Sequence, residues 1–343
     1  MKRRATSQDV ADLAGVSRSA VSLVLNGRGQ GNISVEKQAA ILAAAEELDY
    51  SPNPVALSLR TRRSSTIGVV TDSIATAGFA GQLLQGASER AAAHGYLLLV
   101  IDSQHDRLAE ERAFETLGSR QVDGFIYAAM SLRAYEPSPG LSGSIVALAN
   151  CFDPAGQLAS FVPDEVAGSR SATRHLIESG HREIVMLTGT PDMVASGLRE
   201  QGFAQELAAA ELPVRPPISA GWEIDKGYAA AMHVLTTFEP RPTGLVVAND
   251  RAAIGVVLAA TSLGLSVPRD VSVIGYDDDE NVAPWMVPAL TTVRLPHREM
   301  GEAAIQHLLD QIGGAVQTPG APADKVFLEC PLIIRDSVGQ PAR

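Results

Sequence analysis

Apolar side chains are spaced differently in the first part of the chain and in the remainder. Up to about residue 50 they recur every three or four positions, which is typical of amphipathic helices. From Thr66 onwards, short apolar runs alternate with amphipathic segments, and this alternation predicts parallel, doubly wound sheets. We therefore expect a small all-α head followed by an α/β body.

The apolar runs of the body predict at least seven strands and four helices. The strands are expected at residues 67–70, 97–101, 124–127, 145–148, 184–187, 244–248 and 271–275. The helices are expected at residues 79–94, 108–119, 165–179 and 251–263. The series is interrupted near Pro163 and again near residues 291–293, which indicates two similar lobes rather than one broad sheet.

The head has the pattern of a helix-turn-helix. Thr6 and Asp9 form a predicted capping box at the start of one helix, and Ser17 is expected to cap a second helix over residues 18–25. Gly15 permits the sharp turn between these two helices. A third helix is expected after Ser34. Four of its apolar side chains are expected to close the small core: Ile41, Leu42, Ala45 and Leu48.

The outward face of the second predicted helix distinguishes a DNA-binding unit from a generic helical hairpin. Five residues are expected on that face: Arg18, Ser19, Ala20, Ser22 and Leu23. They are too small or too polar to form a second packing surface. Arg18 can pair with a guanine edge through two hydrogen bonds, and Ala20 or Leu23 can contact a thymine methyl group. We therefore interpret this helix as a recognition helix.

Two connecting segments follow the predicted recognition helix. The glycine-rich loop 27–31 follows a helix rather than a strand, so it does not fit a dinucleotide-binding loop, and we expect a flexible connector whose Arg28 contacts DNA phosphates. Further along, Pro52 and Pro54 flank Asn53, a predicted cap for a helix of about two turns. A helix this short is marginally stable unless something packs against it.

These residues resemble the signature of the LacI/GalR family of bacterial repressors. In the head the resemblance lies in Asp9-Val10-Ala11, Ala14-Gly15-Val16-Ser17, Val21-Ser22, Val24-Leu25-Asn26, Tyr50, Pro52-Asn53, Ala56 and Leu59. In the body it lies in Val122-Asp123-Gly124, Gly180-His181-Arg182, Ala248-Asn249-Asp250, Gly275-Tyr276-Asp277-Asp278 and Arg335-Asp336-Ser337. The resemblance implies a body similar to the periplasmic sugar-binding proteins, with two doubly wound parallel-sheet lobes.

The resemblance also implies domain boundaries. The helix-turn-helix head would cover residues 1–50, a hinge helix and linker residues 51–65, and the effector-binding and dimerisation core residues 66–343. The chain would pass between the lobes near residues 163, 292 and 325. The N-lobe would then contain residues 66–163 and 293–325, and the C-lobe residues 164–292 and 326–343.

The resemblance implies a set of DNA contacts. Arg18, Ser19 and Leu23 would lie in the major groove, and a hinge helix would fold on the operator with Leu59 inserted into a minor-groove step. The full expected set is Thr6, Ser17, Arg18, Ser19, Ala20, Ser22, Leu23, Asn26, Ser34, Asn53, Ala56 and Leu59. Ala20 and Leu23 differ from the residues that are common in the family, so the resemblance does not define the operator sequence.

The body contains a predicted effector site. Ligands of open α/β sheets bind beyond the carboxyl ends of the strands, where Asn249, Asp277 and Phe79 are expected. Arg199 and Trp222 match effector positions of the family. These polar side chains suit hydroxyl groups and the aromatic ones suit a flat ring, which favours a sugar or nucleoside over a fatty or strongly charged ligand. Alternatives stay open for two residues. Trp222 could be a core residue, and Asp250, which follows Asn249, could only cap a helix.

The charge of the chain is unevenly distributed. Residues 1–63 contain nine Lys and Arg against six Asp and Glu, a net charge of +3. Because the whole chain carries −11, the other 280 residues carry −14. A basic end on an acidic body is consistent with a nucleic-acid-binding head.

Other classes of protein lack support in the sequence. We find no catalytic serine elbow, phosphate-binding loop or zinc-binding HExxH pattern, so no enzyme, metal or cofactor is expected. Cys151 and Cys330 are isolated in sequence and are expected to be reduced. No apolar stretch reaches the roughly 18 residues of a membrane span, and residues 5–12 lack the apolar run of a signal peptide. We therefore expect a cytoplasmic protein.

Together these features predict an allosteric repressor. We expect a homodimer that binds near-palindromic double-stranded operator DNA and a small, sugar-like effector. The chain lacks a leucine-rich heptad segment after Ser337, which favours a dimer over a tetramer. Two alternatives stay open: a nucleoside- or purine-responsive regulator of the same family, and a sugar-binding protein that does not bind DNA.

Overall fold

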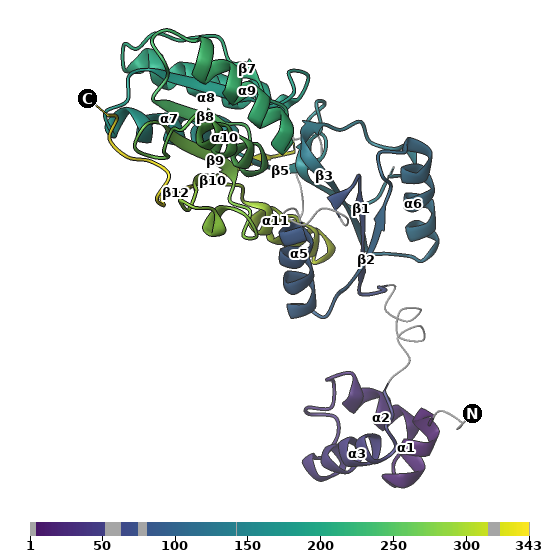
Figure 1. The fold of residues 1–343 in the computed structure, drawn as a ribbon. Helices are drawn as coiled ribbons and strands as arrows, with labels where there is room; N and C mark the ends of the chain where they lie inside the picture. The colour runs from purple at the N-terminus through teal and green to yellow at the C-terminus, as the bar shows by residue number, and fades with distance from the viewer. Residues whose placement is uncertain (1–4, 52–62, 75–80, 142, 315–322, 343) are drawn as a thin grey trace. The chain divides into compact units, whose positions relative to one another are not determined.

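A computed structural model describes residues 5–51, 63–74, 81–141, 143–314 and 323–342. The chain forms two compact units, Met1–Ser65 and Thr66–Arg343, which we describe separately (Figure 1). The fold class predicted from the sequence, a small helical head and a body of two parallel-sheet lobes, is confirmed. Among the described residues, no helix is both long enough and apolar enough to cross a membrane.

The head is a helix-turn-helix followed by a third helix. Its helices are α1 (Ser7–Leu13), α2 (Arg18–Leu25) and α3 (Val35–Glu47). Thr6 and Asp9 form the predicted capping box, and Gly15 takes a φ of +63°, a left-handed conformation that glycine adopts without strain. Val10, Val21 and Ile41, one from each helix, are at most 1% exposed and form the centre of the core.

Two expectations for the head are wrong. Ala20 is only 8% exposed and packs into the core, because it lies on the same face of α2 as Val21 and Val24. Leu42 is 54% exposed, since the core-facing side of α3 is formed by Ile41, Ala44 and Ala45. In the glycine-rich loop, Gly29 accepts a hydrogen bond from the Gln38 side chain at 3.1 Å, and the contact of Arg28 with DNA phosphates stays a prediction.

The N-lobe is built on a six-stranded parallel sheet in the order β11-β5-β4-β3-β1-β2. The strands are β1 (Thr66–Thr71), β2 (Leu97–Asp102), β3 (Gly124–Ala134), β4 (Val146–Phe152), β5 (Ala159–Pro163) and β11 (Lys325–Leu328). The helices are α5 (Gly81–Ala93), α6 (Arg107–Ser119) and α11 (His297–Ile312), with a 3-10 turn, η2 (Pro139–Leu141). Helices α5 and α11 lie side by side on one face of the sheet (Figure 1).

The C-lobe repeats this architecture. Its sheet has the order β12-β10-β9-β8-β6-β7, and only β12 runs antiparallel to its neighbour. The strands are β6 (Ile184–Thr188), β7 (Ile218–Ser219), β8 (Gly244–Val247), β9 (Ser272–Asp277), β10 (Thr291–Arg294) and β12 (Leu332–Ile333). The helices are α7 (Glu165–Glu178), α8 (Val194–Ala209), α9 (Ile224–Thr237) and α10 (Asp250–Ser262), with a 3-10 turn, η3 (Ala283–Trp285).

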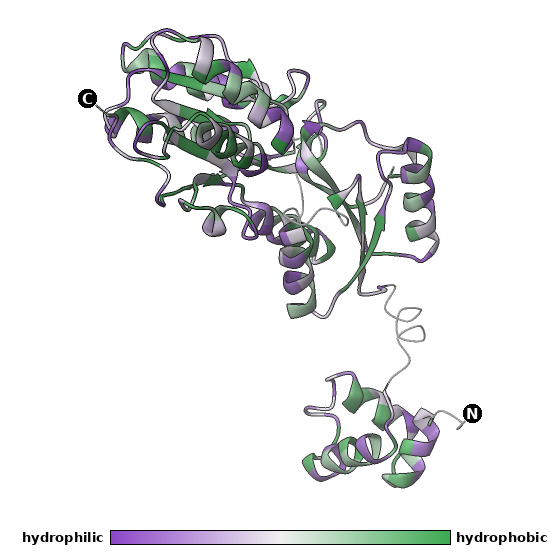
Figure 2. Cartoon of the chain, viewed as in Figure 1, coloured by the Kyte–Doolittle hydropathy of each residue, from purple (hydrophilic) through white to green (hydrophobic). Residues whose placement is uncertain are grey.

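The sheets form the apolar centre of each lobe. In Figure 2 the strands are coloured largely as hydrophobic, while the helices carry hydrophilic residues on one side. Strands β1, β4, β6 and β8 consist almost entirely of buried residues, as expected for a parallel sheet covered on both faces. This burial explains why most of the expected strands read as continuous apolar runs; the edge strand β2 is an exception, because it is partly exposed.

The chain passes between the lobes three times. The first passage lies between β5 and α7 and the second between β10 and α11, next to the expected positions. The third was expected near residue 325, but Lys325–Leu328 forms β11 of the N-lobe sheet. The passage therefore falls between Leu328 and Leu332, a few residues later than the resemblance implied.

Candidate functional site

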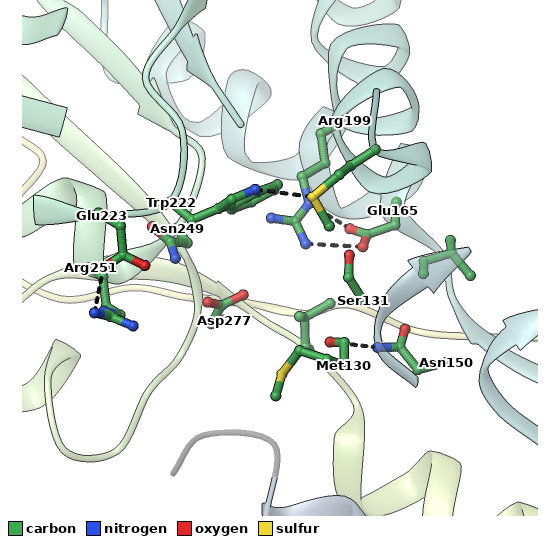
Figure 3. A pocket seen from close by; sticks show the side chains of 13 residues that line it. Met130, Ser131, Asn150, Glu165, Arg199, Trp222, Glu223, Asn249, Arg251 and Asp277 are labelled. Carbon is green, nitrogen blue, oxygen red and sulfur yellow. Dashed lines mark hydrogen bonds and ion pairs between the residues drawn. The ribbon is translucent and has the colours of Figure 1, made fainter. Parts of the chain in front are cut away.

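A pocket of about 270 Å³ lies where the two lobes face each other (Figure 3). Its N-lobe wall comes from the carboxyl ends of β3 and β4, through Met130, Ser131, Leu132 and Asn150. The C-lobe wall comes from the starts of α7, α9 and α10, from α8 and from the end of β9. The pocket thus occupies the position where open α/β sheets bind ligands.

Four of the five effector residues expected from the sequence line this pocket. They are Arg199, Trp222, Asn249 and Asp277, and they come from four different elements or loops of the C-lobe. The fifth, Phe79, lies outside the described residues. The structure brings the four together, and their contact with an effector stays a prediction.

Arg199 is held rigidly inside the C-lobe wall. Its guanidinium donates hydrogen bonds to both carboxylate oxygens of Glu165, at 2.8 and 3.0 Å, and to the backbone oxygen of Ala248 at 2.7 Å. The guanidinium carbon lies 3.6 Å from the centre of the Tyr276 ring. Burial alone lowers the pKa of Arg199, but the attraction of Glu165 outweighs it and the pKa is raised. Arg199 is therefore charged and fixed before any ligand binds.

Asp277 presents a carboxylate to the pocket at the end of β9. Within the described part of the chain its side chain accepts no hydrogen bond, and Figure 3 shows it between Trp222 and Met130 without a partner. Its backbone has a φ of +109°, a conformation that is costly for a residue with a Cβ atom. Burial raises the pKa of Asp277 well above its usual value, and the nearby Arg199 offsets only part of this effect. Such a strained, unpartnered carboxylate is suited to receive hydrogen bonds from a ligand.

The turn after Asp277 is held by Asp250, which lies beneath the pocket and does not line it. The Asp250 carboxylate is fully buried and accepts hydrogen bonds from the Thr292 hydroxyl at 2.6 Å and the Asp279 backbone N–H at 2.8 Å. Burial raises the pKa of Asp250 to about 7. The expectation that Asp250 caps α10 is wrong, because Asn249 is the cap and its side-chain oxygen accepts from the Ala252 N–H.

Trp222 combines the two roles that the sequence left open. Its ring packs against Gly189, where an added Cβ atom would lie only 2.2 Å from the indole, so glycine is required there. The indole N–H faces the Met193 sulfur at 3.1 Å. The same ring lines the pocket, and a packed aromatic wall of this kind offers a flat surface to a ligand ring.

Sequence reasoning missed the N-lobe wall and Glu165. Asn150 lies near the carboxyl end of β4, so the strand-end rule that found Asn249 also applies to it. Its amide donates to the backbone oxygens of Ala129 and Met130 at 3.0 and 3.1 Å, which fixes the irregular end of β3. Glu165 gives no such signal, because an acidic residue in the first turn of a helix is usually explained by the helix dipole.

In the head, several of the expected DNA contacts also have a local structural role. Thr6, Ser17 and Ser34 accept hydrogen bonds from the backbone at the starts of their helices. Asn26 donates to the backbone oxygen of Ser22 and, at 3.3 Å, to its hydroxyl. Leu23 is half-buried on α2. Asn53, Ala56 and Leu59, with the expected hinge helix, lie outside the described residues.

Arg18 and Ser19 differ from these capping residues. Both are exposed at the start of α2, and neither forms a side-chain hydrogen bond with the part of the chain that the structure describes. Capping therefore explains Thr6, Ser17 and Ser34 without DNA, whereas it does not explain Arg18 and Ser19. These two carry most of the weight in the assignment of α2 as a recognition helix.

A helix-turn-helix head joined to a two-lobed body with a pocket between the lobes is typical of transcription regulators. The model for bacterial regulatory proteins of the lacI family matches residues 6–53, and that for the periplasmic binding protein-like domain matches residues 173–338. The chain belongs to the LacI family and is a DNA-binding transcriptional repressor.

Individual relatives agree with this assignment. The chain is 35% identical to the HTH-type transcriptional repressor PurR of Serratia proteamaculans (strain 568), over 90% of each sequence. Its fold matches the lac repressor dimer bound to operator and the anti-inducer ONPF, with a TM-score of 0.80, 28% identity, and coverage of 98% of this chain and 100% of that one. It also matches the transcriptional regulator CelR–cellobiose complex, with a TM-score of 0.68, 29% identity, and coverage of 97% and 100%.

Proposed function

We propose that this repressor binds a near-palindromic operator as a homodimer and that a small polar ring compound in the pocket between the lobes controls its operator affinity. The observation that carries the proposal is the convergence of Arg199, Trp222, Asn249 and Asp277 on one pocket. A ligand held by both lobes favours one relative arrangement of the lobes. It shifts operator affinity by the difference between its affinities for the two arrangements.

Two ligand classes fit the lining. A sugar is favoured by the many polar groups and by Trp222, which offers a flat apolar face to a sugar ring, and the CelR neighbour is a cellobiose complex. A purine base or nucleoside is the second candidate. It is favoured by the sulfur and aliphatic side chains that line the pocket together with Trp222, namely Met130, Leu132 and Leu295, and by the similarity to PurR repressors.

In the head, we propose that Arg18 and Ser19 contact base edges and that Ser17, Ser22, Asn26 and Ser34 contact phosphates. The capping hydrogen bonds fix these side chains at the surface of the head, which is what phosphate recognition needs. Thr6 would act at the start of α1 in the same way. Ala20 is excluded from this set because it is buried, and Leu23 has only part of its side chain available.

The test begins with a duplex selected from random sequences for binding to the full-length chain. We expect its affinity, measured by fluorescence anisotropy, to fall steeply as salt increases, because phosphate contacts release counterions. Arg18→Ala is expected to weaken binding about tenfold or more, a loss of 1–3 kcal/mol. Exposed Lys37→Ala on α3 is the control for a general loss of positive charge. Equal losses in both variants would contradict the assignment of the recognition helix.

The effector is sought by measuring the thermal stability of the full-length protein with sugars, nucleosides and purine bases. A compound at about one hundred times its dissociation constant stabilises the body by about 2.7 kcal/mol. A compound that stabilises the protein is then expected to change operator affinity in the anisotropy assay. A stabilising compound that leaves operator affinity unchanged would contradict effector control.

A further inference from the structure

The charged side chains that line the pocket show a pairing pattern. Arg199 is paired with Glu165, and Arg251 is paired with Glu223 through a hydrogen bond of 2.5 Å (Figure 3). Each arginine of the wall thus has a carboxylate from the same wall as its partner. Among the described lining residues, Asp277 is the one charged group without a counter-ion.

The Arg199–Glu165 pair is the decisive one because it is buried. The side chain of Arg199 is 5% exposed and that of Glu165 is 2% exposed. Two parallel hydrogen bonds between a guanidinium and a carboxylate are the geometry in which a buried arginine holds an anionic ligand group. Glu165 occupies this position, so three of the five N–H groups of Arg199 are already used by protein acceptors.

The charges that line the pocket do not add up to a positive value. Two arginines face three carboxylates, which gives a net charge of −1 with Asp277 ionised and zero with Asp277 protonated. Residues 75–80, which lie outside the described part of the chain, contain no ionisable side chain. A ligand that brings a phosphate or carboxylate would therefore meet no free cation and would repel Asp277.

We propose that Glu165 is a specificity-determining residue: it acts as a built-in counter-ion for Arg199 and restricts the pocket to ligands that have no anionic group and that donate hydrogen bonds to Asp277. This inference rests on the proposed function of the pocket as an effector site. A pocket of this kind would not bind phosphorylated sugars or nucleotides, whereas unphosphorylated sugars, purine bases and nucleosides remain candidate ligands. The remaining polar groups fit such a ligand, since the Asn249 amide N–H groups donate and the Asn150 side-chain oxygen accepts.

The first test measures the electrostatic potential in the pocket without any effector. The chain has two tryptophans, and Trp285→Phe removes the exposed one, so that Trp222 reports on the pocket alone. Fluorescence of Trp222 in the full-length protein is quenched with iodide and with caesium at constant ionic strength. Each quenching constant is divided by that of N-acetyltryptophanamide. We expect caesium to quench Trp222 at least as efficiently as iodide after this correction, because the lining carries a net charge of zero or −1.

Glu165→Gln then tests the residue itself. The amide keeps the size of the side chain and removes its charge, which leaves Arg199 as an uncompensated cation. One unit charge within about 8 Å changes the local concentration of a monovalent ion about two- to threefold, so iodide quenching is expected to increase by about this factor. Glu178→Gln is the matched control, because Glu178 is exposed at the far end of the same helix. Equal iodide quenching constants in Glu165→Gln and Glu178→Gln would overturn the proposal. A larger corrected quenching constant for iodide than for caesium in the protein that retains Glu165 would also overturn it.

The second test uses matched pairs of ligands and does not depend on the variant folding. Thermal stabilisation of the wild-type protein is compared for adenosine and adenosine monophosphate, and for glucose and glucose 6-phosphate. Greater stabilisation by a phosphorylated member would overturn the proposal. If neither pair stabilises the protein, the quenching comparison in the protein with Glu165 decides. Failure of operator binding in the anisotropy assay would instead contradict the proposed function and would leave the quenching result valid.

Discussion

The two lobes share one architecture but contribute differently to the pocket. Every charged side chain that lines the pocket belongs to the C-lobe: Glu165, Arg199, Glu223, Arg251 and Asp277. The N-lobe wall is formed by Met130, Ser131, Leu132 and Asn150, which are uncharged. In the proposed effector site the C-lobe therefore supplies all the ionisable groups, whereas the N-lobe supplies an uncharged wall.

This difference has a structural origin. Helix and strand ends of the C-lobe point four side chains inward from rigid elements, and buried partners hold two of them: Glu165 holds Arg199, and Asp250 holds the turn after Asp277. In the N-lobe the wall is the irregular end of β3, fixed by hydrogen bonds from Asn150 to its backbone. The C-lobe site is thus preorganised through side chains and the N-lobe wall through backbone.

The largest expected effect follows from removing the cation of the C-lobe wall. Arg199→Ala leaves the buried Glu165 carboxylate without a partner, and breaking a buried pair in this way costs about 3–5 kcal/mol. Chemical denaturation of the body measures the loss. Arg215→Ala is the control, because its ion pair with Glu183 is partly exposed and should contribute less than about 1 kcal/mol. Comparable losses in both variants would show that burial of the first pair has no energetic consequence.

A larger part of the fold than of the candidate site could be predicted from the sequence. Continuous apolar runs found seven strands, most of which are buried on both faces as parallel strands usually are. They did not find five strands. β7 and β12 span only two residues each, and β5, β10 and β11 lie where the apolar series was expected to be interrupted or to pass between the lobes. In the site, the strand-end rule found Asn249 and Asp277. It missed Glu165, because ion pairing with Arg199 across 34 residues depends on how α7 and α8 pack.

The second prediction concerns Asp250, which lies beneath the C-lobe wall, and is tested by measuring how stability depends on pH. Because the pKa of Asp250 is raised to about 7 in the folded state, the folded protein binds a proton at Asp250 more tightly than the unfolded chain does. The contribution of protonated Asp250 to the free energy of unfolding is fully present below about pH 4 and is lost as the pH rises towards 7. Relative to Asp250→Asn, the wild-type body should lose about 1.4 kcal/mol of unfolding free energy per pH unit between pH 5 and 7. A pH-independent difference between the two proteins would refute this assignment.

The two walls are compared directly through ligand affinity. For a compound selected in the thermal screen, Asp277→Asn should weaken binding about 10- to 100-fold, because a ligand donor that loses its buried acceptor costs about 1–3 kcal/mol. Ser131→Ala, on the N-lobe wall, should weaken binding less than about tenfold. Basal operator binding should be unchanged in both variants. A larger effect of Ser131 than of Asp277 would reverse the division of roles between the lobes.

The smallest expected effect concerns the backbone of the N-lobe wall. Asn150 is 2% exposed and has a φ of +54°, a left-handed conformation that asparagine tolerates better than alanine does. Asn150→Ala removes two hydrogen bonds to buried backbone oxygens and should cost about 1–3 kcal/mol of unfolding free energy. Asn150→Gly removes the same hydrogen bonds without the conformational strain, so it should be the more stable of the two variants by up to about 1 kcal/mol.

If alanine were as stable as glycine at this position, the left-handed backbone would not contribute to the wall. If both variants matched the wild type in stability and in ligand affinity, Asn150 would not hold the end of β3, and the N-lobe wall would be fixed by other contacts.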